Sequence, residues 1–380
     1  MTTNNTNTST TTQVEASRPI RIGISQGDTN GVGYELIFKT FSESTMFELC
    51  TPIVFGHIKV ANYHRKALNF NTQLNVISSA EEAVPGKLNF VNCSDNELKI
   101  EFGVQSPDAG HAAFQSLEQA VIAYKSGEID ALVTAPINKK SIQSSNFHFV
   151  GHTEYLQDRF AAEGQEPLMI LCNDIMRVAL VTTHLPISEV AFAITEEKVA
   201  LKAQLLYQSL QRDFNISAPR IAVLALNPHA GDGGVLGHEE SDIILPVIKS
   251  LSDAGMPCYG PYAADGFFGA GLYRHFDGIL AMYHDQGLAP FKALSMSGGV
   301  NFTANLPIVR TSPDHGTAYD IAGKGIAQAD SFRQAIYAAI DVYRNRVSYD
   351  ECHVNPLPKL YQATLTDSSE DFLLRNILTI

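Results

Sequence analysis

Apolar residues recur along the chain with two periods, and these predict strands and helices in alternation. Residues 19–24 alternate apolar and polar positions, as a strand does, and run into the glycine-rich turn Gly27–Gly33, after which we expect a helix from about Tyr34. Further strands are predicted at Thr51–Phe55, Leu74–Ser78, Ala131–Thr134, Leu168–Cys172, Arg177–Thr182, Arg220–Leu226 and Gly278–Met282. Helical spacing is found at Leu117, Ala120, Val121 and Tyr124, and across Glu196–Leu210 and Ser331–Tyr343.

Several of the predicted strands are short and continuously apolar. Such runs are expected when helices cover both faces of a sheet, so the alternation predicts an α/β fold with a mostly parallel sheet. The length of 380 residues suggests two or three domain-sized units. Because no low-complexity linker separates them, ordered chain must cross any domain boundary.

The composition is that of a globular protein with an acidic balance. Of the residues, 45% are hydrophobic and 18% charged, and the formal net charge is −13. An acidic chain repels phosphate backbones, and no cluster of Lys and Arg opposes this, so we expect no nucleic-acid partner. The five cysteines are scattered and form no CxxC pair, which predicts buried, reduced thiols.

The first 17 residues are a Thr/Asn/Ser tract that cannot bury enough apolar surface to order itself, and we predict a disordered tail. The tract has no apolar core of a signal peptide, and no apolar run in the chain reaches transmembrane length. We therefore expect a cytoplasmic protein without a membrane span.

Three apolar strands end in loops that carry a histidine, namely His184, His229 and His284. Ligands of open α/β sheets bind outside the carboxyl ends of the strands, so three imidazoles there can converge on one cation. A His₃ set with open positions suits catalytic zinc and similar ions. Any one of these histidines alone is more often a hydrogen-bonded loop residue, and Asp232, Asp285 and His238 are near enough in sequence to compete as ligands.

Other clusters are candidate anion sites. Gly27–Gly33 either cradles a phosphate or forms a tight turn into a helix, and the chain has neither G-x-G-x-x-G nor a Walker A sequence. Lys292, Asn301 and Arg310 suit a phosphate or carboxylate, although surface charges are the commoner fate of Lys and Arg. Residues 151–155, GHTEY, form either a helix cap with Thr153 starting the helix or a polar wall of the site.

Together, several segments resemble the PdxA family, the 4-hydroxythreonine-4-phosphate dehydrogenases of vitamin B6 synthesis. They are GDTNGVGYEL, LVTAPINK, GHTEYL, RVALVTTHLPI, LNPHAGDGG, YHDQGLAPFK and GVNFTANLPIVRTSPDHGTAYDIAGKG, in order over most of residues 20–345. The last is also similar to a run in isocitrate and isopropylmalate dehydrogenases. The resemblance implies a two-domain fold of that superfamily, with residues 18–145 plus 323–380 as domain 1, residues 146–322 as the metal, substrate and dimerisation domain, and the active site in the cleft between them.

The resemblance also implies the site residues of a homodimer. Metal ligands fall on His184, His229 and His284, two from one chain and the third from its partner. Substrate contacts fall on His152, Thr153, Lys292, Asn301 and Arg310, and acidic residues near the metal, the catalytic candidates, on Asp265 and Asp285. A non-Rossmann site for NAD or NADP falls on the loop with Asp314, His315, Gly316 and Thr317.

The implied activity is NAD(P)-dependent oxidation of 4-(phosphooxy)-L-threonine at C3, with a divalent cation lowering the pKa of the hydroxyl. Decarboxylation to 3-amino-2-oxopropyl phosphate follows, in pyridoxal 5′-phosphate biosynthesis. Three imidazoles favour zinc or cobalt, while magnesium, manganese, the choice between NAD and NADP, and the general base stay open.

Two departures from the family pattern leave room for another substrate. The first loop reads GDTNGVGYEL rather than a GDPAGIGPE-like run, and Asp232 stands where Glu is common. A 4-phospho-D-threonate or 4-phospho-D-erythronate dehydrogenase of the same family is therefore the nearest alternative. From other classes, a metal-dependent hydrolase, a transferase or a non-catalytic binding protein remain, although the run Asp314–Gly325 argues against the hydrolase.

Overall fold

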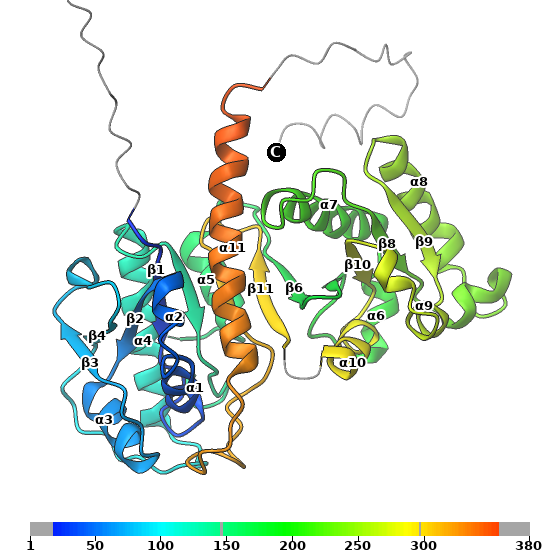
Figure 1. Cartoon of the computed structure of the whole chain (residues 1–380). Helices are drawn as coiled ribbons and strands as arrows, with labels where there is room; N and C mark the ends of the chain where they lie inside the picture. Colours follow the sequence, from blue (N-terminus) through cyan, green and yellow to red (C-terminus); the bar gives the residue numbers. More distant parts are fainter. Residues whose placement is uncertain (1–17, 145–146, 296–297, 357–380) are drawn as a thin grey trace, which may run out of the picture.

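One sheet of twelve strands runs through the part of the chain that the computed structural model describes, residues 18–144, 147–295 and 298–356 (Figure 1). The strands lie in the order β3-β4-β2-β1-β5-β12-β11-β6-β7-β10-β8-β9. Eight of the eleven neighbouring pairs are parallel, and the three antiparallel pairs lie together near the centre, around β11 and β6. The strands are β1 Arg21–Ser25, β2 Thr51–Gly56, β3 Leu74–Ile77, β4 Leu88–Asn92, β5 Ala131–Thr134, β6 Leu168–Cys172, β7 Arg177–Leu180, β8 Ile221–Leu224, β9 Cys258–Tyr262, β10 Gly278–Ala281, β11 Val300–Ala304 and β12 Arg310–Pro313.

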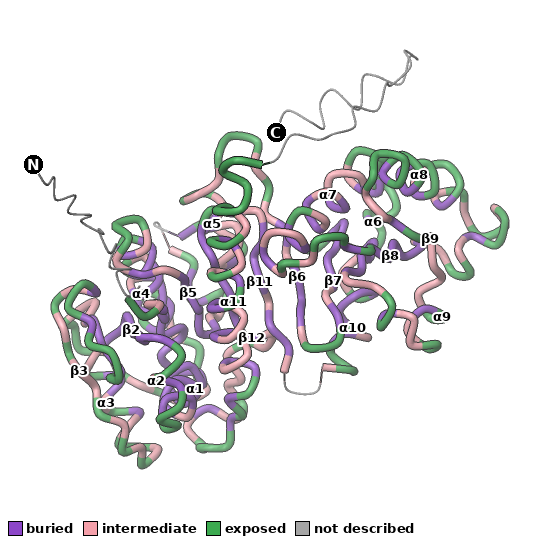
Figure 2. The backbone as a smooth tube through the Cα atoms, turned by 45° about the horizontal axis from the view of Figure 1, so that its top comes forward, coloured by how far each residue is buried: buried purple, intermediate pink, exposed green. Residues whose placement is uncertain are grey.

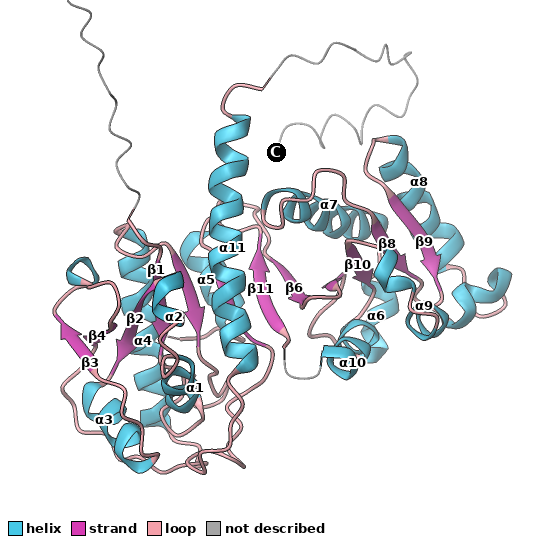
Figure 3. Ribbon diagram, viewed as in Figure 1, coloured by secondary structure: helices cyan, strands magenta, loops and turns pink. Residues whose placement is uncertain are grey.

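Helices cover both faces of the sheet (Figure 3), so the predicted α/β fold with a mostly parallel sheet is confirmed. Strands such as β5, which were predicted from continuous apolar runs, are buried along their whole length, and Figure 2 shows the buried strands enclosed by more exposed helices. The helices are α1 Gly33–Thr40, α2 Met46–Leu49, α3 Ile58–Ala67, α4 Pro107–Lys125, α5 His152–Phe160, α6 Ile187–Ala193, α7 Glu196–Arg212, α8 Leu245–Asp253, α9 Ala264–Gly269, α10 His284–Ser295 and α11 Asp330–His353.

The hydrophobic core differs between the two faces. On one face a single cluster extends across the molecule under α1, α11, α7 and α8. On the other face the core is in two parts, one under α4 and α5 and one under α9 and α10. The layer of helices is therefore interrupted between α5 and α10, over the central strands, and this interruption is where a ligand can reach the sheet.

The long helix α11 crosses the middle of the sheet (Figure 1). It packs on β5, β12 and β11 and on α7, and so connects the half of the sheet from β3 to β5 with the half from β6 to β9. The strands β12 and β11 continue the sheet between the halves. The domain limits at 145/146 and 322/323 stay a prediction, and residues 145–146 lie outside the described part, as does the predicted tail 1–17.

The seven strands predicted from later apolar runs are all present, with bounds that differ by at most two residues. Four strands were not predicted, β4, β9, β11 and β12, because asparagine, glycine or proline interrupts their apolar patterns. No helix in the described part of the chain combines the length and apolar content that crossing a bilayer requires.

All five cysteines are free, in agreement with the expected reduced thiols. Cys50, Cys172 and Cys258 are buried, and burial raises their pKa to about 12. Cys93 is partly buried, and Cys352, near the end of α11, is exposed, so the prediction of buried thiols is wrong for Cys352.

A buried ion pair connects α11 to the end of α7. Arg346 Nε donates to Asp213 Oδ1 at 2.6 Å, and the two side chains are only 6% and 4% exposed. Arg346 Nη1 also donates to the carbonyl oxygens of Leu306 and Pro307, between β11 and β12. Since Asp213 follows α7, one guanidinium ties together the end of α7, α11 and the β11–β12 connection.

We expect Arg346→Met to lower the free energy of unfolding by about 3–5 kcal/mol, because it leaves the Asp213 carboxylate buried without its partner. Chemical denaturation of the variant beside the wild type measures this. The exposed pair Arg220–Asp277 is the matched control, and Arg220→Met should change stability by less than about 1 kcal/mol. Equal losses for the two variants would contradict the structural role of Arg346.

Candidate active site

A cavity of about 250 Å³ lies at the interruption between α5 and α10. Its floor is the face of the central strands, with Thr134 from β5, Leu171 from β6, Asn301 from β11, and Arg310 and Ser312 from β12. Its walls are the loop after β5, the start of α5, the loop after β7 and one side of α10. Both halves of the sheet therefore contribute to the cavity.

Most of the predicted site residues meet in this cavity. They are His152, Thr153, His184, His284, Lys292, Asn301, Arg310, Asp314, His315 and Gly316. Four predicted residues do not line it, namely His229, Asp265, Asp285 and Thr317.

The order of the strands explains why two of the three histidines approach each other. Strands β7 and β10 are parallel neighbours, so the loop with His184 and the helix start at His284 leave the sheet at the same edge. The two imidazole ring centroids are 6.1 Å apart. Two imidazoles bound to one zinc ion at about 2.0–2.1 Å have centroids roughly 5–6 Å apart, so this pair fits a shared cation after a small adjustment.

His229 follows β8, the next parallel strand, but its loop leads it away from the cavity. Residues 229–233 have left-handed backbone angles, with φ of 53° at His229 and 45° at Asp232. Such angles are unfavourable for residues other than glycine and persist only where the surroundings hold them. Here Glu240, which is buried, accepts hydrogen bonds from Asn227 N–H and from its side-chain amide. These hydrogen bonds lie at the base of the loop that carries His229, and His229 itself is exposed.

Among the described residues, no group of three or more His, Cys, Asp or Glu side chains is close enough to hold a metal ion. Two histidines from one chain are therefore brought together and the third is not.

The carboxylate of Asp285 acts on His284 rather than on the cavity. Asp285 Oδ1 is 2.7 Å from His284 Nδ1, and its side chain is 84% exposed. Accepting the Nδ1 proton leaves Nε2 with the lone pair that a metal needs, and fixes the ring orientation. Asp265, in the first turn of α9, is exposed and outside the cavity.

The pKa of His184 is lowered, first by burial and then by the charge of Lys139, while Glu154 opposes these effects. Burial lowers the pKa of His152 further, and the charges of Arg310 and Lys139 act in the same direction. Both imidazoles are consequently neutral at pH 7, the form that ligates metals or accepts hydrogen bonds.

Arg310 supplies a buried positive charge. Its side chain is 3% exposed, and its guanidinium donates to the hydroxyls of Thr134 and Thr303. Burial lowers its pKa to about 10, and the charge of Glu154 partly offsets this effect. A guanidinium out of water with only hydroxyl partners is costly to bury, so it favours an anionic ligand in the cavity beside it.

Two further polar atoms in the cavity lining lack a partner. Nε2 of His152 and Oδ1 of Asn301 are buried and have no hydrogen bond within the described chain. Buried polar atoms are nearly always satisfied in folded proteins. These two therefore mark places where a bound molecule donates or accepts hydrogen bonds.

The structure supports both interpretations left open for GHTEY. A helix, α5, begins in this segment, but at His152 with Gly151 as its N-cap, one residue before the predicted start at Thr153. His152, Thr153 and Glu154 line the cavity, which supports the polar wall. Sequence reasoning did not assign Lys139 and Glu154, which also line it, although both lie in segments that resemble the family, LVTAPINK and GHTEYL.

The glycine-rich turn is occupied by the chain itself. The N–H of Val32, just before α1, donates to the carbonyl oxygen of Thr317 at 3.1 Å, and a Cβ at Gly31 would lie 2.9 Å from that oxygen. A tight turn packed on the 314–317 loop therefore agrees with the structure better than a phosphate cradle. Asp314, His315 and Gly316 face the cavity, whereas Thr317 faces this turn.

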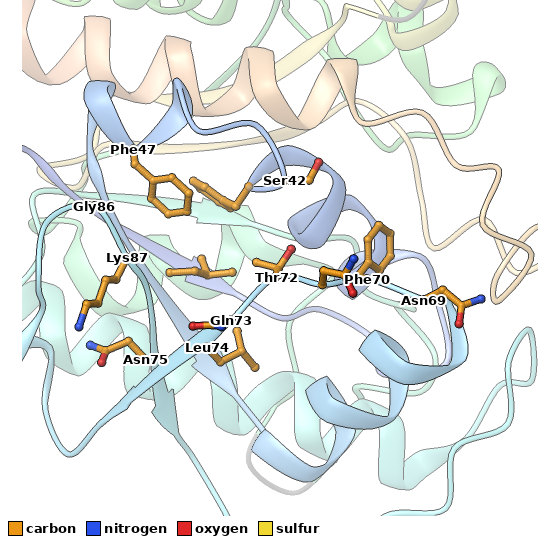
Figure 4. A pocket seen from close by; sticks show the side chains of 13 residues that line it. Ser42, Phe47, Asn69, Phe70, Thr72, Gln73, Leu74, Asn75, Gly86 and Lys87 are labelled. Atoms are coloured by element: carbon orange, nitrogen blue, oxygen red, sulfur yellow. The ribbon is translucent and has the colours of Figure 1, made fainter.

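A larger cavity, of about 590 Å³, lies elsewhere, next to β3 and the end of α1 (Figure 4). It is lined by aromatic and amide side chains such as Phe47, Phe70 and Asn75, with Lys87 as its charged residue. None of the residues lining it is a predicted site residue or a His, Cys, Asp or Glu. Size favours this cavity, but the acid–base and ligand groups are in the smaller one, which we therefore take as the active site.

Comparisons with known proteins show what the whole chain is similar to. A profile of the family described as "Pyridoxal phosphate biosynthetic protein PdxA" matches residues 48–339. A 4-hydroxythreonine-4-phosphate dehydrogenase from Bacteroides thetaiotaomicron is 60% identical over 92% of this chain and 96% of its own length. A D-threonate 4-phosphate dehydrogenase from Cupriavidus necator is 38% identical over 86% of this chain and 98% of its own.

Solved structures give the same result. The crystal structure of 4-hydroxythreonine-4-phosphate dehydrogenase from Klebsiella pneumoniae superposes with a TM-score of 0.75 at 30% identity, over 86% of this chain and 99% of that one. The extent of the profile match and the coverage of the relatives establish that the chain belongs to the PdxA family.

Proposed function

We propose that this protein is a 4-hydroxythreonine-4-phosphate dehydrogenase of pyridoxal 5′-phosphate biosynthesis. It oxidises 4-(phosphooxy)-L-threonine at C3 with NAD or NADP, and decarboxylation then gives 3-amino-2-oxopropyl phosphate. The relative from Bacteroides thetaiotaomicron carries this enzyme's name at 60% identity, which supports the choice.

The single observation that carries the proposal is the buried Arg310 at the floor of a cation-rich cavity. Lys139 and Lys292 line the same cavity, and Glu154 and Asp314 are its carboxylates. A substrate with a phosphate at one end and a carboxylate at the other supplies anions for these cations. Asn301 and His152 have free polar atoms for its hydroxyl and phosphate oxygens. We assign Arg310 and Lys292 to the anionic ends.

The imidazoles of His184 and His284 fit a divalent cation, because their rings are near each other and Asp285 orients one of them. Zinc or cobalt suits such ligands better than magnesium or manganese. A cation held by these imidazoles would supply Lewis-acid polarisation of the C3 hydroxyl, and a nicotinamide nucleotide would supply the hydride acceptor. The part of the protein is to hold the substrate still: Lys292 is two helical turns from His284 on the same side of α10, so one helix face aligns the metal end and the anionic end.

The third ligand, in this proposal, is His229 from a second copy of the chain. Exposed apolar side chains stand beside the histidine loops: Ile187 is 72% exposed and Phe192 87%, both in α6 just after His184, and Val235 is 79% exposed just after His229. Apolar side chains this exposed near a functional site favour a protein interface. A homodimer that covers them brings a strained, outward-facing His229 toward the other subunit's cavity.

The nucleotide site is proposed on Asp314, His315, Gly316 and Thr317, the loop that leaves β12 at the cavity. The nearest alternative is a 4-phospho-D-threonate or 4-phospho-D-erythronate dehydrogenase, and the relative from Cupriavidus necator has such a name at 38% identity. The alternative substrates carry a hydroxyl where 4-(phosphooxy)-L-threonine carries an amine, and the lower identity of that relative favours the amino substrate.

Turnover of the purified protein with each phosphorylated acid, with NAD or NADP, and with or without a chelator tests the proposal. We expect reduction of one nucleotide, highest with 4-(phosphooxy)-L-threonine and abolished by the chelator. A preference for phosphothreonate would select the alternative, and hydrolysis without nucleotide reduction would select a metal-dependent hydrolase.

Arg310→Met separates function from stability. We expect the KM for the phosphorylated substrate to rise about 10- to 100-fold, the usual effect of losing charge-assisted hydrogen bonds. The Tm should stay the same or rise, because an incompletely compensated buried charge is replaced by an apolar side chain of similar length. Steady-state kinetics and thermal unfolding measure both. Arg346→Met, which breaks a complete pair, should lower the Tm, and a similar fall for Arg310→Met would contradict the ligand-binding role.

Phe192→Asp tests the shared metal site. Because this side chain is already exposed, the fold should persist, while dimerisation and metal affinity should fall together. Sedimentation and metal titration follow the two effects, and Val354→Asp, at an 83% exposed position beyond α11, is the control. A monomer that keeps full metal affinity would rule out a ligand from the second copy.

A further inference from the structure

The loop that leaves the active site after β12 has no helix or strand until α11 begins, yet it has a fixed support. Its residues 317–319 rest on the turn Asp28–Val32 that follows β1. The carbonyl oxygen of Thr317 accepts the Val32 N–H, and the absence of a side chain at Gly31 lets the two segments approach this closely. The two segments are almost 300 positions apart in sequence, so the contact fixes the loop to the rigid sheet.

A side-chain hydrogen bond completes this support. Tyr319 donates its phenolic proton to Asp28 Oδ2 at 2.8 Å, and the other carboxylate oxygen accepts the Asn30 N–H at 2.9 Å. Asp28 is 1% exposed. A hydrogen bond to a buried carboxylate is stronger than one between neutral groups, and water does not replace it easily.

Residues 101–104, which Asn30 holds, also pack on this loop. Asn30 Oδ1 accepts the Glu101 N–H at 3.0 Å, and Asn30 Nδ2 donates to the Val104 carbonyl oxygen at 2.8 Å. This segment presses on the loop at two points. A Cβ at Gly103 would lie 2.5 Å from the Tyr319 carbonyl oxygen, and one at Gly323 would lie 2.5 Å from the Phe102 ring.

We propose that Asp28 and Tyr319 are positioning residues for the nucleotide: their hydrogen bond holds the 314–325 loop in its binding conformation before the nucleotide arrives. The proposal rests on the nucleotide site proposed at Asp314–Thr317. If the loop became ordered only on binding, the entropy lost in ordering it would make the binding free energy less favourable and would weaken the affinity for the nucleotide. The effect of the bond therefore falls on nucleotide affinity, whereas the groups that hold the phosphorylated substrate, Arg310 and Lys292, lie on separate elements.

Tyr319→Phe keeps the ring and removes the phenolic hydroxyl, with its hydrogen bond to Asp28 and its contacts with Ser141 and Asn138. We expect the dissociation constant of the reduced nucleotide, measured by its fluorescence without substrate, and the KM for the oxidised nucleotide to rise about tenfold, the usual scale for a hydrogen bond to a charged group. The kcat at saturating nucleotide and the KM for the phosphorylated substrate should stay within about twofold of the wild type. Amide hydrogen exchange in residues 314–325 should become faster.

Tyr124→Phe is the matched control, since Tyr124 donates to the carbonyl oxygen of Pro307, away from this loop. It should leave the nucleotide constants and the exchange of residues 314–325 unchanged. Asp28→Asn is the second variant and should weaken nucleotide binding in the same direction.

Changes of kcat and both KM values together, or nucleotide constants equal to the wild type, would overturn the positioning role while leaving the proposed function in place. A wild-type protein that binds and reduces neither nucleotide would instead overturn the proposed function, and this inference with it.

Discussion

The candidate active site depends on a positive charge buried at the centre of the sheet. Arg310 begins β12, which lies between β5 and β11, so its backbone is fixed by strands on both sides. Within hydrogen-bonding distance the described residues give its guanidinium two threonine hydroxyls, Thr134 and Thr303, and no carboxylate. Water is excluded there, and hydroxyl dipoles replace only part of the lost hydration. The cavity is therefore built for an anion, and an anion that binds should also stabilise the fold.

The same central strands explain why the cavity exists. On one face the core is continuous under α1, α11 and α7. On the other face the helices part between α5 and α10, which leaves β6, β11 and β12 open to a ligand. Alternate residues of a strand face opposite sides, so Phe302 enters the core while its neighbour Asn301 faces the cavity. The antiparallel strand β11 thus serves stability and recognition at once.

Much of this arrangement could be predicted from the sequence, because the apolar runs of strands such as β5 and β6 are uninterrupted and their ends are marked by polar loops. The strands that were missed have polar residues with special partners. In β4, Asn89 is fully buried because its amide donates to the carbonyl oxygens of Pro52 and Val84, which a period of apolar residues cannot reveal. In β9, a Gly260–Pro261 pair is tolerated because the strand is at the edge of the sheet.

The residues of the candidate site, like the strands, could be predicted only in part. His184 and His284 could be predicted to meet because parallel neighbours end at one edge, whereas the position of His229 depends on left-handed residues that no spacing rule foresees. Asp285 was expected near the metal as a catalytic group. In the structure its carboxylate is hydrogen-bonded to His284 Nδ1 instead. Adjacent residues at the start of a helix can form such a bond although only one of them lines the cavity. Lys139 and Glu154 were not assigned because a charged residue in a polar loop or in the first turn of a helix has no pattern that separates a wall of a cavity from the surface.

The first glycine-rich turn illustrates how a departure from a family pattern can be read physically. The sequence has Asn30 where the GDPAGIGPE-like run has alanine, and the amide of Asn30 makes two hydrogen bonds to residues 101–104 that a methyl group cannot make. Those residues in turn cover the loop that carries Tyr319 and Gly323. The departure leaves the cavity lining untouched, because none of residues 27–33 lines it. The departure therefore affects the loop after β12 and not the surroundings of Arg310. For this reason it is weak evidence for a different substrate, even though it lies in a family motif.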